Sequence, residues 1–424
     1  MMPNGNIDEV PEAQDNQNGR EALEMPNGEG LLGAGDVQNV FLYEALDDPS
    51  TPSLRLQRRQ YVRQEHVRFL RSRLRIFDEY LVTRRGEAFL DFIKLLPNEF
   101  ENLYQRIGSR LEHFTTHAGP ISGRHRLMVY LRYVTQGITF KAYALDIGIS
   151  ISTVAAIVRE VTEAIIIDMH SEAFPRIKRG KFIQVARITQ ERYDYPRAVG
   201  FLDGKHIHIK KPARSGSIFY NYQHYNSIIL LALCDCDHRI IAYDVGAPGR
   251  ADDAGVLRDS ALKRFLDRHD NVFPLTTELG NVGPVQYHIL VNGGFGQGHR
   301  FIRPYREAEA DTPDKRRFNK QLSGARQIIE QTFGLLAQRF QVLMYRMNLD
   351  PVQTQRLVIS LMILHNLLPR RQDSLEAVQR FEPAPNAAYH PLEREEPEAG
   401  TESANRARER LTQYYIDKDG PARS

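Results

Sequence analysis

Apolar residues recur every three or four positions over much of the first part of the chain, and this spacing predicts a helical domain over residues 53–170. The pattern runs through residues 67–77 and returns over residues 89–96. Pro97 then suits the first turn of a further helix, because proline needs no hydrogen-bond acceptor there.

Residues 139–165 predict a helix-turn-helix. One helix ends at Gly137, a second one runs to residue 147, and a third begins at Ser152, which is a good N-cap residue. Two short helices joined by a turn with glycine can place the second helix in the DNA major groove. The exposed face of that helix offers one cation, Arg159, beside two glutamates, so a bundle that only braces the next domain stays open as the alternative.

The pattern changes to strands after residue 197. Short apolar runs bounded by turn residues predict a sheet, and the tight turn at residues 236–238 predicts an antiparallel hairpin. We therefore expect a mixed α/β domain over residues 197–371. Its predicted strands are 198–209, 227–235, 239–245 and 286–291, and its predicted helices lie around 259–266 and at 323–340 and 351–368.

The remaining segments show no such periodicity. Residues 1–52 predict a disordered acidic tail, since the first forty residues hold eight acids and one arginine. Residues 171–196 predict a basic connector between the two domains. Residues 372–424 predict a flexible acidic tail that includes a short helix near residues 404–414.

Composition places the chain among ordinary globular proteins, with 42% hydrophobic and 26% charged residues. The net charge of +3 is mild, but residues 55–75 hold eight arginines and one glutamate, which is typical of either a phosphate-binding element or a solvated helix face. Cys234 and Cys236 lie too close together for an ordinary disulfide, which indicates a reducing compartment. We find no apolar run long enough for a membrane span and no secretory signal pattern, and we expect a soluble intracellular protein.

The candidate chemistry begins at Asp203. A buried strand runs into this carboxylate, and Gly204 follows it, so a ligand could approach the backbone closely. An Asp-Gly pair after a strand is also typical of a hairpin turn. Glu330 is a second candidate, because it shares a helical stripe with the small residues Gly334 and Ala337 and can lie close to a sheet edge or a ligand.

Seven short motifs occur in an order that resembles the PIF/Harbinger class of DDE transposases and their domesticated, nuclease-like relatives. They cover about residues 89–370 and are LRYVTQG with GISISTV, FLDGKHI, GAPGRADDAGVLRDS, YHILVNGGF, RPY, FNKQLSGARQIIEQTFGLLAQRF and LHNLL. The resemblance implies an RNase H-like fold, in which a mixed sheet is flanked by helices.

The resemblance also implies a catalytic site of three acids that hold two divalent cations, Mg²⁺ or Mn²⁺. The motifs place the first acid at Asp203 and the last at Glu330. The second position falls on Asn292, where the family pattern has an aspartate. Asparagine removes one negative charge from a site that must hold two dications, so we expect a nuclease that is weak or inactive.

Several alternatives stay open at this site. Asp253, or its neighbour Asp252, could replace the missing metal ligand, although a structural role in the loop is the simpler interpretation. A single metal ion could also bind through Asp203 and Glu330. The alternating His206, His208, Cys234 and Cys236 could compose a zinc site, but a polar cluster beside the core is the interpretation we favour. The run GGFGQG leads into proline rather than a helix, so we reject a dinucleotide-binding loop.

Charge in the second half of the predicted nuclease domain favours DNA as a partner. Residues 300–371 hold thirteen arginines and lysines against six acids, and residues 315–320 predict a phosphate-contacting loop. The candidate DNA-binding residues are Arg159, Lys315, Arg316, Arg317, Lys320 and Arg326.

Two functions remain. The first is a metal-dependent DNA endonuclease or transposase. The second is a domesticated transposase that binds DNA or chromatin as a scaffold without efficient cleavage, and Asn292 favours this second function. The resemblance further implies a separate Myb/SANT-like partner protein and a location in the nucleus, with the cytoplasm and a homo-oligomer as open possibilities.

Overall fold

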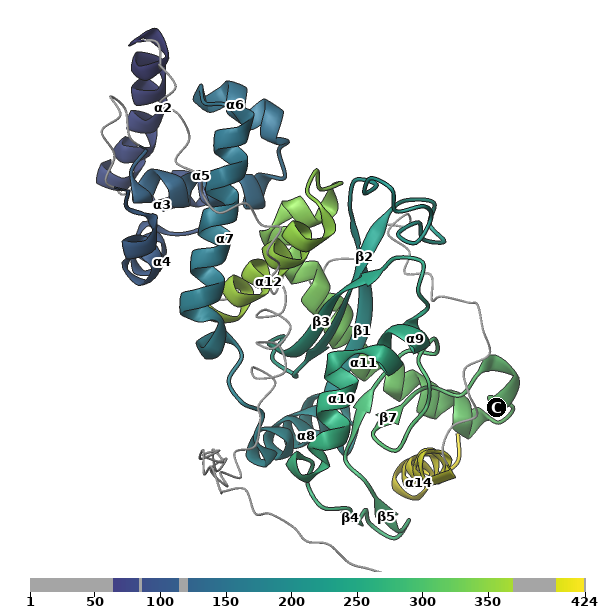
Figure 1. Cartoon of the computed structure of the whole chain (residues 1–424). Helices are drawn as coiled ribbons and strands as arrows, with labels where there is room; N and C mark the ends of the chain where they lie inside the picture. The colour runs from purple at the N-terminus through teal and green to yellow at the C-terminus, as the bar shows by residue number, and fades with distance from the viewer. Residues whose placement is uncertain (1–63, 84–85, 114–120, 369–401, 423–424) are drawn as a thin grey trace, which may run out of the picture. The chain divides into compact units, whose positions relative to one another are not determined.

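The computed structural model describes residues 64–83, 86–113, 121–368 and 402–422, and the tail predicted at 1–52 lies outside them. Helices alone make up the described part before residue 197 (Figure 1). They are α2 (Gln64–Thr83), α3 (Gly86–Ile93), α4 (Pro97–Leu111), α5 (Gly123–Gln136), α6 (Phe140–Ile147), α7 (Ile151–Ala173) and α8 (Arg179–Tyr193).

The predicted helix-turn-helix segment corresponds to α6 and α7. Gly148 ends α6 in a left-handed conformation with φ of 80°, which favours glycine. The side chain of Ser150 accepts a hydrogen bond from the Thr153 amide, so the N-cap is Ser150 and the prediction of Ser152 was wrong. In the described residues, no single helix is long and apolar enough to span a membrane, whereas α6 and α7 together pass that test by length and composition but are bent by 105°.

A five-stranded mixed sheet lies at the centre of the described part after residue 197, in the order β3-β2-β1-β6-β7. The first three strands are antiparallel, and β6 and β7 run parallel to β1. This is an RNase H-like arrangement, as expected. The strands are β1 (Ala198–His208), β2 (Ser227–Cys234), β3 (Ile240–Pro248), β6 (His288–Leu290) and β7 (Phe301–Ile302), and a separate pair is formed by β4 (Thr277–Glu278) and β5 (Pro284–Val285).

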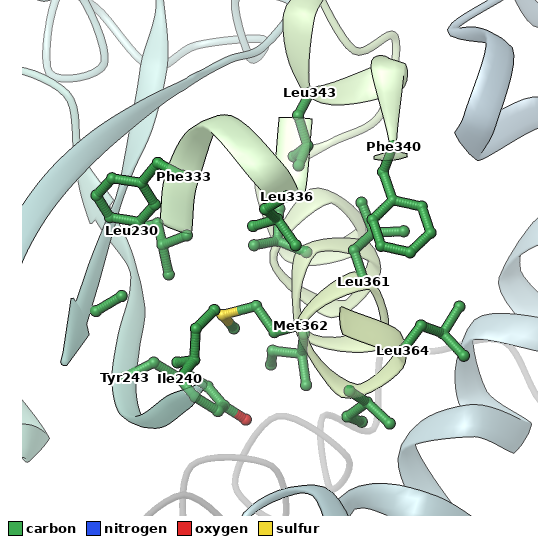
Figure 2. Close-up of a cluster of buried hydrophobic side chains, with 14 of the residues drawn as sticks. Leu230, Ile240, Tyr243, Phe333, Leu336, Phe340, Leu343, Leu361, Met362 and Leu364 are labelled. Atoms are coloured by element: carbon green, nitrogen blue, oxygen red, sulfur yellow. The ribbon is translucent and has the colours of Figure 1, made fainter. Parts of the chain in front are cut away.

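Helices bury both faces of this sheet, which explains why β2 is apolar at almost every position. Leu230 packs into one core with α11 (Pro313–Arg339) and α12 (Pro351–Leu367), and its neighbour Leu231 packs into a second core with α8 and α10 (Ala261–Arg268). α7 also contacts α12, so the N-terminal helices pack against a helix that covers the sheet. Figure 2 shows part of the first core, with Leu230, Ile240, Tyr243, Phe333, Leu336, Phe340, Leu343, Leu361, Met362 and Leu364 labelled.

Two segments that were predicted as a connector and a loop contain helices instead, and the predicted C-terminal tail contains a longer helix than the one expected near residues 404–414. The basic connector includes α8, which buries Phe182 and Val185. The predicted phosphate-contacting loop at 315–320 belongs to α11, which begins at Pro313 after the N-cap Thr312 rather than at residue 323. The last described segment forms α14 (Glu402–Asp419), which packs against α11, while residues 369–401 lie outside the described part.

Candidate functional site

Asp203 lies in the middle of β1, between β2 and β6. The strand continues to His208, and Gly204 pairs with Leu231, so the Asp-Gly pair forms neither a strand end nor a hairpin turn. The Asp203 side chain is fully buried, and its Oδ1 accepts a hydrogen bond of 2.8 Å from the Gly204 amide. A buried carboxylate requires such donors, because water cannot solvate its charge.

Asn292 follows β6, the parallel neighbour of β1, and therefore reaches the same region as Asp203. Its Nδ2 donates a hydrogen bond of 3.0 Å to Asp203 Oδ1, and its Oδ1 accepts one of 2.7 Å from the Gly294 amide. Asn292 thus presents a donor to the acid, while its oxygen binds its own loop.

Glu330 approaches from α11 together with Arg326, one helical turn earlier. Arg326 Nη1 donates to Asp203 Oδ2 at 3.1 Å, and Arg326 Nη2 donates to Glu330 Oε1 at 2.6 Å. The structure therefore brings Asp203, Asn292 and Glu330 together, as the motif order predicts. The position of Arg326 differs from the prediction of a surface DNA contact, since its side chain is 15% exposed and bridges the two acids.

Lys205 is a further basic residue at this site that the sequence analysis missed. It follows Asp203 by two residues, so both side chains lie on the same face of β1. Its ammonium lies 5.8 Å from the centre of the Phe333 ring. Burial lowers the pKa of Lys205, while the Asp203 charge acts in the opposite direction. The two-residue spacing from Asp203 was the signal that could have revealed it.

The loop acids proposed as substitute ligands lie before and within α9 (Asp253–Asp259). Asp252 caps this helix by accepting a hydrogen bond from the Gly255 amide, which is a structural role. Asp253 begins the helix, and its side chain lies outside the described part. His206, considered above for zinc, contacts the Ser227 hydroxyl at 2.9 Å. Among the described residues, no group of three or more His, Cys, Asp and Glu residues could hold a metal ion.

The candidate DNA-binding cations differ in their surroundings. Lys315 pairs with Asp311 at 2.7 Å, and Arg317 pairs with Asp314 at 3.1 Å. Arg316 donates to the Ala310 carbonyl on the preceding turn. Within the described ranges, the exposed residues Arg159 and Lys320 form no ion pair with an acid. These two are the most available of the set for a phosphate.

Comparison with known proteins supports the relationship that the geometry suggests. A family model described as DDE superfamily endonuclease matches residues 202–366, from the residue before Asp203 to the last turn of α12. The match covers that segment, and the relatives below support a relationship to transposase-derived DDE proteins. No solved structure matches the chain at a significant level.

Three relatives illustrate the range of the DDE family. "Putative nuclease HARBI1" of Homo sapiens is 24% identical over 302 residues, which cover 69% of this chain and 78% of the relative. The protein of the same name from Xenopus laevis is 24% identical over 305 residues, with the same coverage. "Protein ALP1-like" of Arabidopsis thaliana is 22% identical over 262 residues, which cover 61% of this chain and 63% of the relative.

DDE superfamily endonucleases generally use divalent metal ions, but this site does not fit a pair of them. Asp203 and Glu330 supply two negative charges and Arg326 one positive charge, which leaves at most a single negative charge for two dications even before Lys205 is counted. Both oxygens of Asp203 already accept hydrogen bonds from basic or amide groups. The arrangement is that of a satisfied ion-pair network rather than a paired-metal site.

Proposed function

We propose that this chain is a DNA- or chromatin-associated binding protein, derived from a DDE transposase, whose acidic site has weak or no cleavage activity. The observation that carries the proposal is the state of Asp203, which is bound by Arg326 on one oxygen and by the Asn292 amide on the other. Groups that already neutralise and hydrogen-bond this carboxylate compete with any metal ion for it.

The residue at position 292 decides how much charge the site can offer. A family member with aspartate there would have three carboxylates, whereas this chain has two. Preorganised charge that stabilises a developing transition state is commonly the largest single contribution to catalysis, so the loss of one ligand charge is expected to lower turnover by orders of magnitude. A divalent cation is therefore proposed as a weak ligand of this site and not as a resident cofactor.

Binding to DNA is supported by the charge balance of residues 300–371, where thirteen basic residues outnumber six acids. Lys320 and Arg159 supply exposed charges that no described acid neutralises. We further propose that the protein acts in the nucleus and that a Myb/SANT-like protein partner selects the DNA sequence. Nuclear import of the tagged full chain and co-purification with such a protein test these two points.

A cleavage assay on supercoiled DNA with Mg²⁺ or Mn²⁺ tests the main proposal. The natural protein and Glu330→Ala should both leave the DNA intact, because neither has three acidic ligands. Asn292→Asp restores the third acid and is the variant in which metal-dependent nicking should appear. Glu330→Ala in the Asn292→Asp background should remove that nicking, which controls for contaminating nucleases.

One observation favours the alternative of an active metal-dependent endonuclease that hydrolyses phosphodiester bonds. Arg326 links Asp203 to Glu330, and Asn292 donates directly to Asp203, so the three positions of the proposed DDE motif lie close together. Robust cutting by the natural protein that disappears in Glu330→Ala would establish this alternative and refute the scaffold proposal.

A further inference from the structure

The loop between β1 and β2, residues 210–226, is a basic surface that the sequence analysis did not single out. It contains Lys210, Lys211 and Arg214 and has no Asp or Glu. All three basic residues are exposed, and none forms an ion pair with an acid in the described residues. Three positive charges therefore face solvent on one loop beside the sheet, which is the electrostatic footprint of a polyanion site.

Exposed rings accompany these charges. Tyr220 is 45% exposed and Tyr222 is 38% exposed, and both lie on the same loop as the three basic residues. The Tyr220 ring lies 6.2 Å from the ring of His224, and the Tyr222 ring lies 5.6 Å from the ring of His206 on β1. Each tyrosine thus keeps solvent-exposed surface beside an imidazole that supports it.

The backbone of the loop is held in place by hydrogen bonds. The Ser227 amide donates to the Phe219 carbonyl at 2.8 Å, and the Asn221 amide donates to the Tyr225 carbonyl at 2.9 Å. The buried Asn221 side chain also donates to the Ser227 hydroxyl at 2.9 Å. Little conformational entropy remains to be lost when a ligand binds, and this preorganisation favours binding.

We propose that this loop binds unpaired, single-stranded DNA, with bases stacked on Tyr220 and Tyr222 and phosphates bound by Lys210, Lys211 and Arg214. Aromatic rings beside a positively charged path are the features with which proteins bind single strands without sequence preference. A duplex offers its phosphates but hides the faces of its bases, so it would leave the tyrosine rings unused. The inference rests on the proposed DNA-binding function and names the form of DNA that this surface accepts.

Fluorescence anisotropy with the full chain tests the inference on two probes, a labelled oligo-dT and a duplex of equal length. Tyr220→Ala should weaken oligo-dT binding by about tenfold, which corresponds to ~1.4 kcal/mol of lost stacking, and should leave duplex binding within twofold. Tyr220→Phe keeps the ring and should bind oligo-dT like the natural protein. Lys211→Ala should lower the slope of log K against log salt for oligo-dT by about 0.7.

Leu275→Ala is the matched control, because Leu275 is an exposed apolar residue outside the loop. Normal oligo-dT binding by Tyr220→Ala, or an equal loss of duplex and oligo-dT binding, would overturn the inference while the proposed function stands. A further outcome is that the protein binds oligo-dT through Tyr220 and does not bind the duplex at all. That result would support the inference and count against recognition of double-stranded DNA. Capture of an acidic peptide in preference to oligo-dT would also refute the inference.

Discussion

Arg326 is the residue on which the state of the acidic site depends. Its planar guanidinium donates to Asp203 and to Glu330 at the same time, and Asp203 has no access to water. The guanidinium therefore supplies the positive charge that both carboxylates share. Sequence spacing could predict the contact between Arg326 and Glu330, since they are four residues apart on a helix, but not the contact with Asp203, which depends on how α11 crosses β1.

We predict that Arg326→Gln lowers the free energy of unfolding by about 3 kcal/mol, because it leaves a buried carboxylate without its cation. The same variant should be stabilised by Mn²⁺, since the two acids then face each other without a competing charge. Urea unfolding with and without Mn²⁺ measures both effects. Lys320→Gln removes a charge at an exposed position of the same helix and should change neither the stability nor the response to Mn²⁺. If Arg326→Gln is as stable as the natural protein and Mn²⁺ does not stabilise it, the interpretation of the ion pair is wrong.

Asn292→Asp should also make the stability of the protein depend on a metal ion. It places a second carboxylate within hydrogen-bond distance of Asp203, and like charges so close together destabilise each other. The variant is therefore expected to be less stable than the natural protein in EDTA and to recover stability in Mg²⁺. Asn292→Ala removes the amide without adding a charge, so a metal response in that variant would show that the effect is unspecific. Thermal unfolding in the two buffers provides the comparison.

Helices with polar sequences were predicted incompletely, since α8 was expected to be a connector and α14 only a short helix in a flexible tail. α8 and α14 each carry many charges, and a charged segment without a strong apolar stripe is easily interpreted as a connector or a tail. A few buried residues hold each helix against the rest of the protein. Tyr415 is an example, since its ring is buried and its hydroxyl donates to the Asp194 carbonyl. Apolar runs such as β2 and α12 were predicted well, since burial on all sides leaves a signal in the sequence itself.

The packing of α14 gives a second test. Leu411 is fully buried, so Leu411→Ala should lower the free energy of unfolding by about 3 kcal/mol through lost burial and a remaining cavity. Gln413 is exposed on the same helix, and Gln413→Ala should change stability very little. Chemical unfolding followed by circular dichroism compares the two variants. Equal stabilities would mean that α14 is the flexible tail predicted from the sequence.

The first half of α11 offers a test of which cations contact DNA. Lys320 forms no ion pair among the described residues, whereas Lys315 on the same helix pairs with Asp311. If duplex DNA lies along this helix, Lys320→Ala should lower the slope of log K against log salt by about 0.9, and Lys315→Ala should lower it less because Asp311 competes for the charge. Binding isotherms at several salt concentrations decide between them. Unchanged slopes for both variants would exclude this face of α11 from the DNA interface.

The whole molecule is predicted to lose stability in mild acid. Burial lowers the pKa of His170 and of His288 to about 4, from the ordinary value near 6.5. The unfolded chain therefore binds more protons than the folded protein between pH 6.5 and pH 4, so the free energy of unfolding should fall as the pH is lowered through this window. Above pH 6.5 both histidines are neutral in the folded and the unfolded chain, so their burial causes no loss of stability there.

Urea midpoints at pH 7, 5.5 and 4.5 measure that loss, and His288→Gln should reduce its steepness because one buried imidazole is removed. The comparison uses the slope against pH and not the absolute stability, which the substitution also changes. An identical slope in the variant would show that other groups cause the acid sensitivity.

At the scale of the chain, the order of the motifs predicted an RNase H-like domain and the meeting of three distant residues at one site. The sequence did not reveal the direction in which the Asn292 amide points or the cation that occupies the site. Both depend on side-chain contacts between elements far apart in the chain, for which periodicity carries no signal.

The contacts of Arg326 with Asp203 and Glu330 also affect which substitutions related proteins can tolerate during evolution. Substitution of either acid takes one carboxylate away from Arg326 and should destabilise the fold, even in a protein that never cuts DNA. The first and last acids are therefore expected to persist among relatives regardless of activity. Position 292 takes no part in this ion pair, so we expect its identity to be the better guide to which relatives remain nucleases.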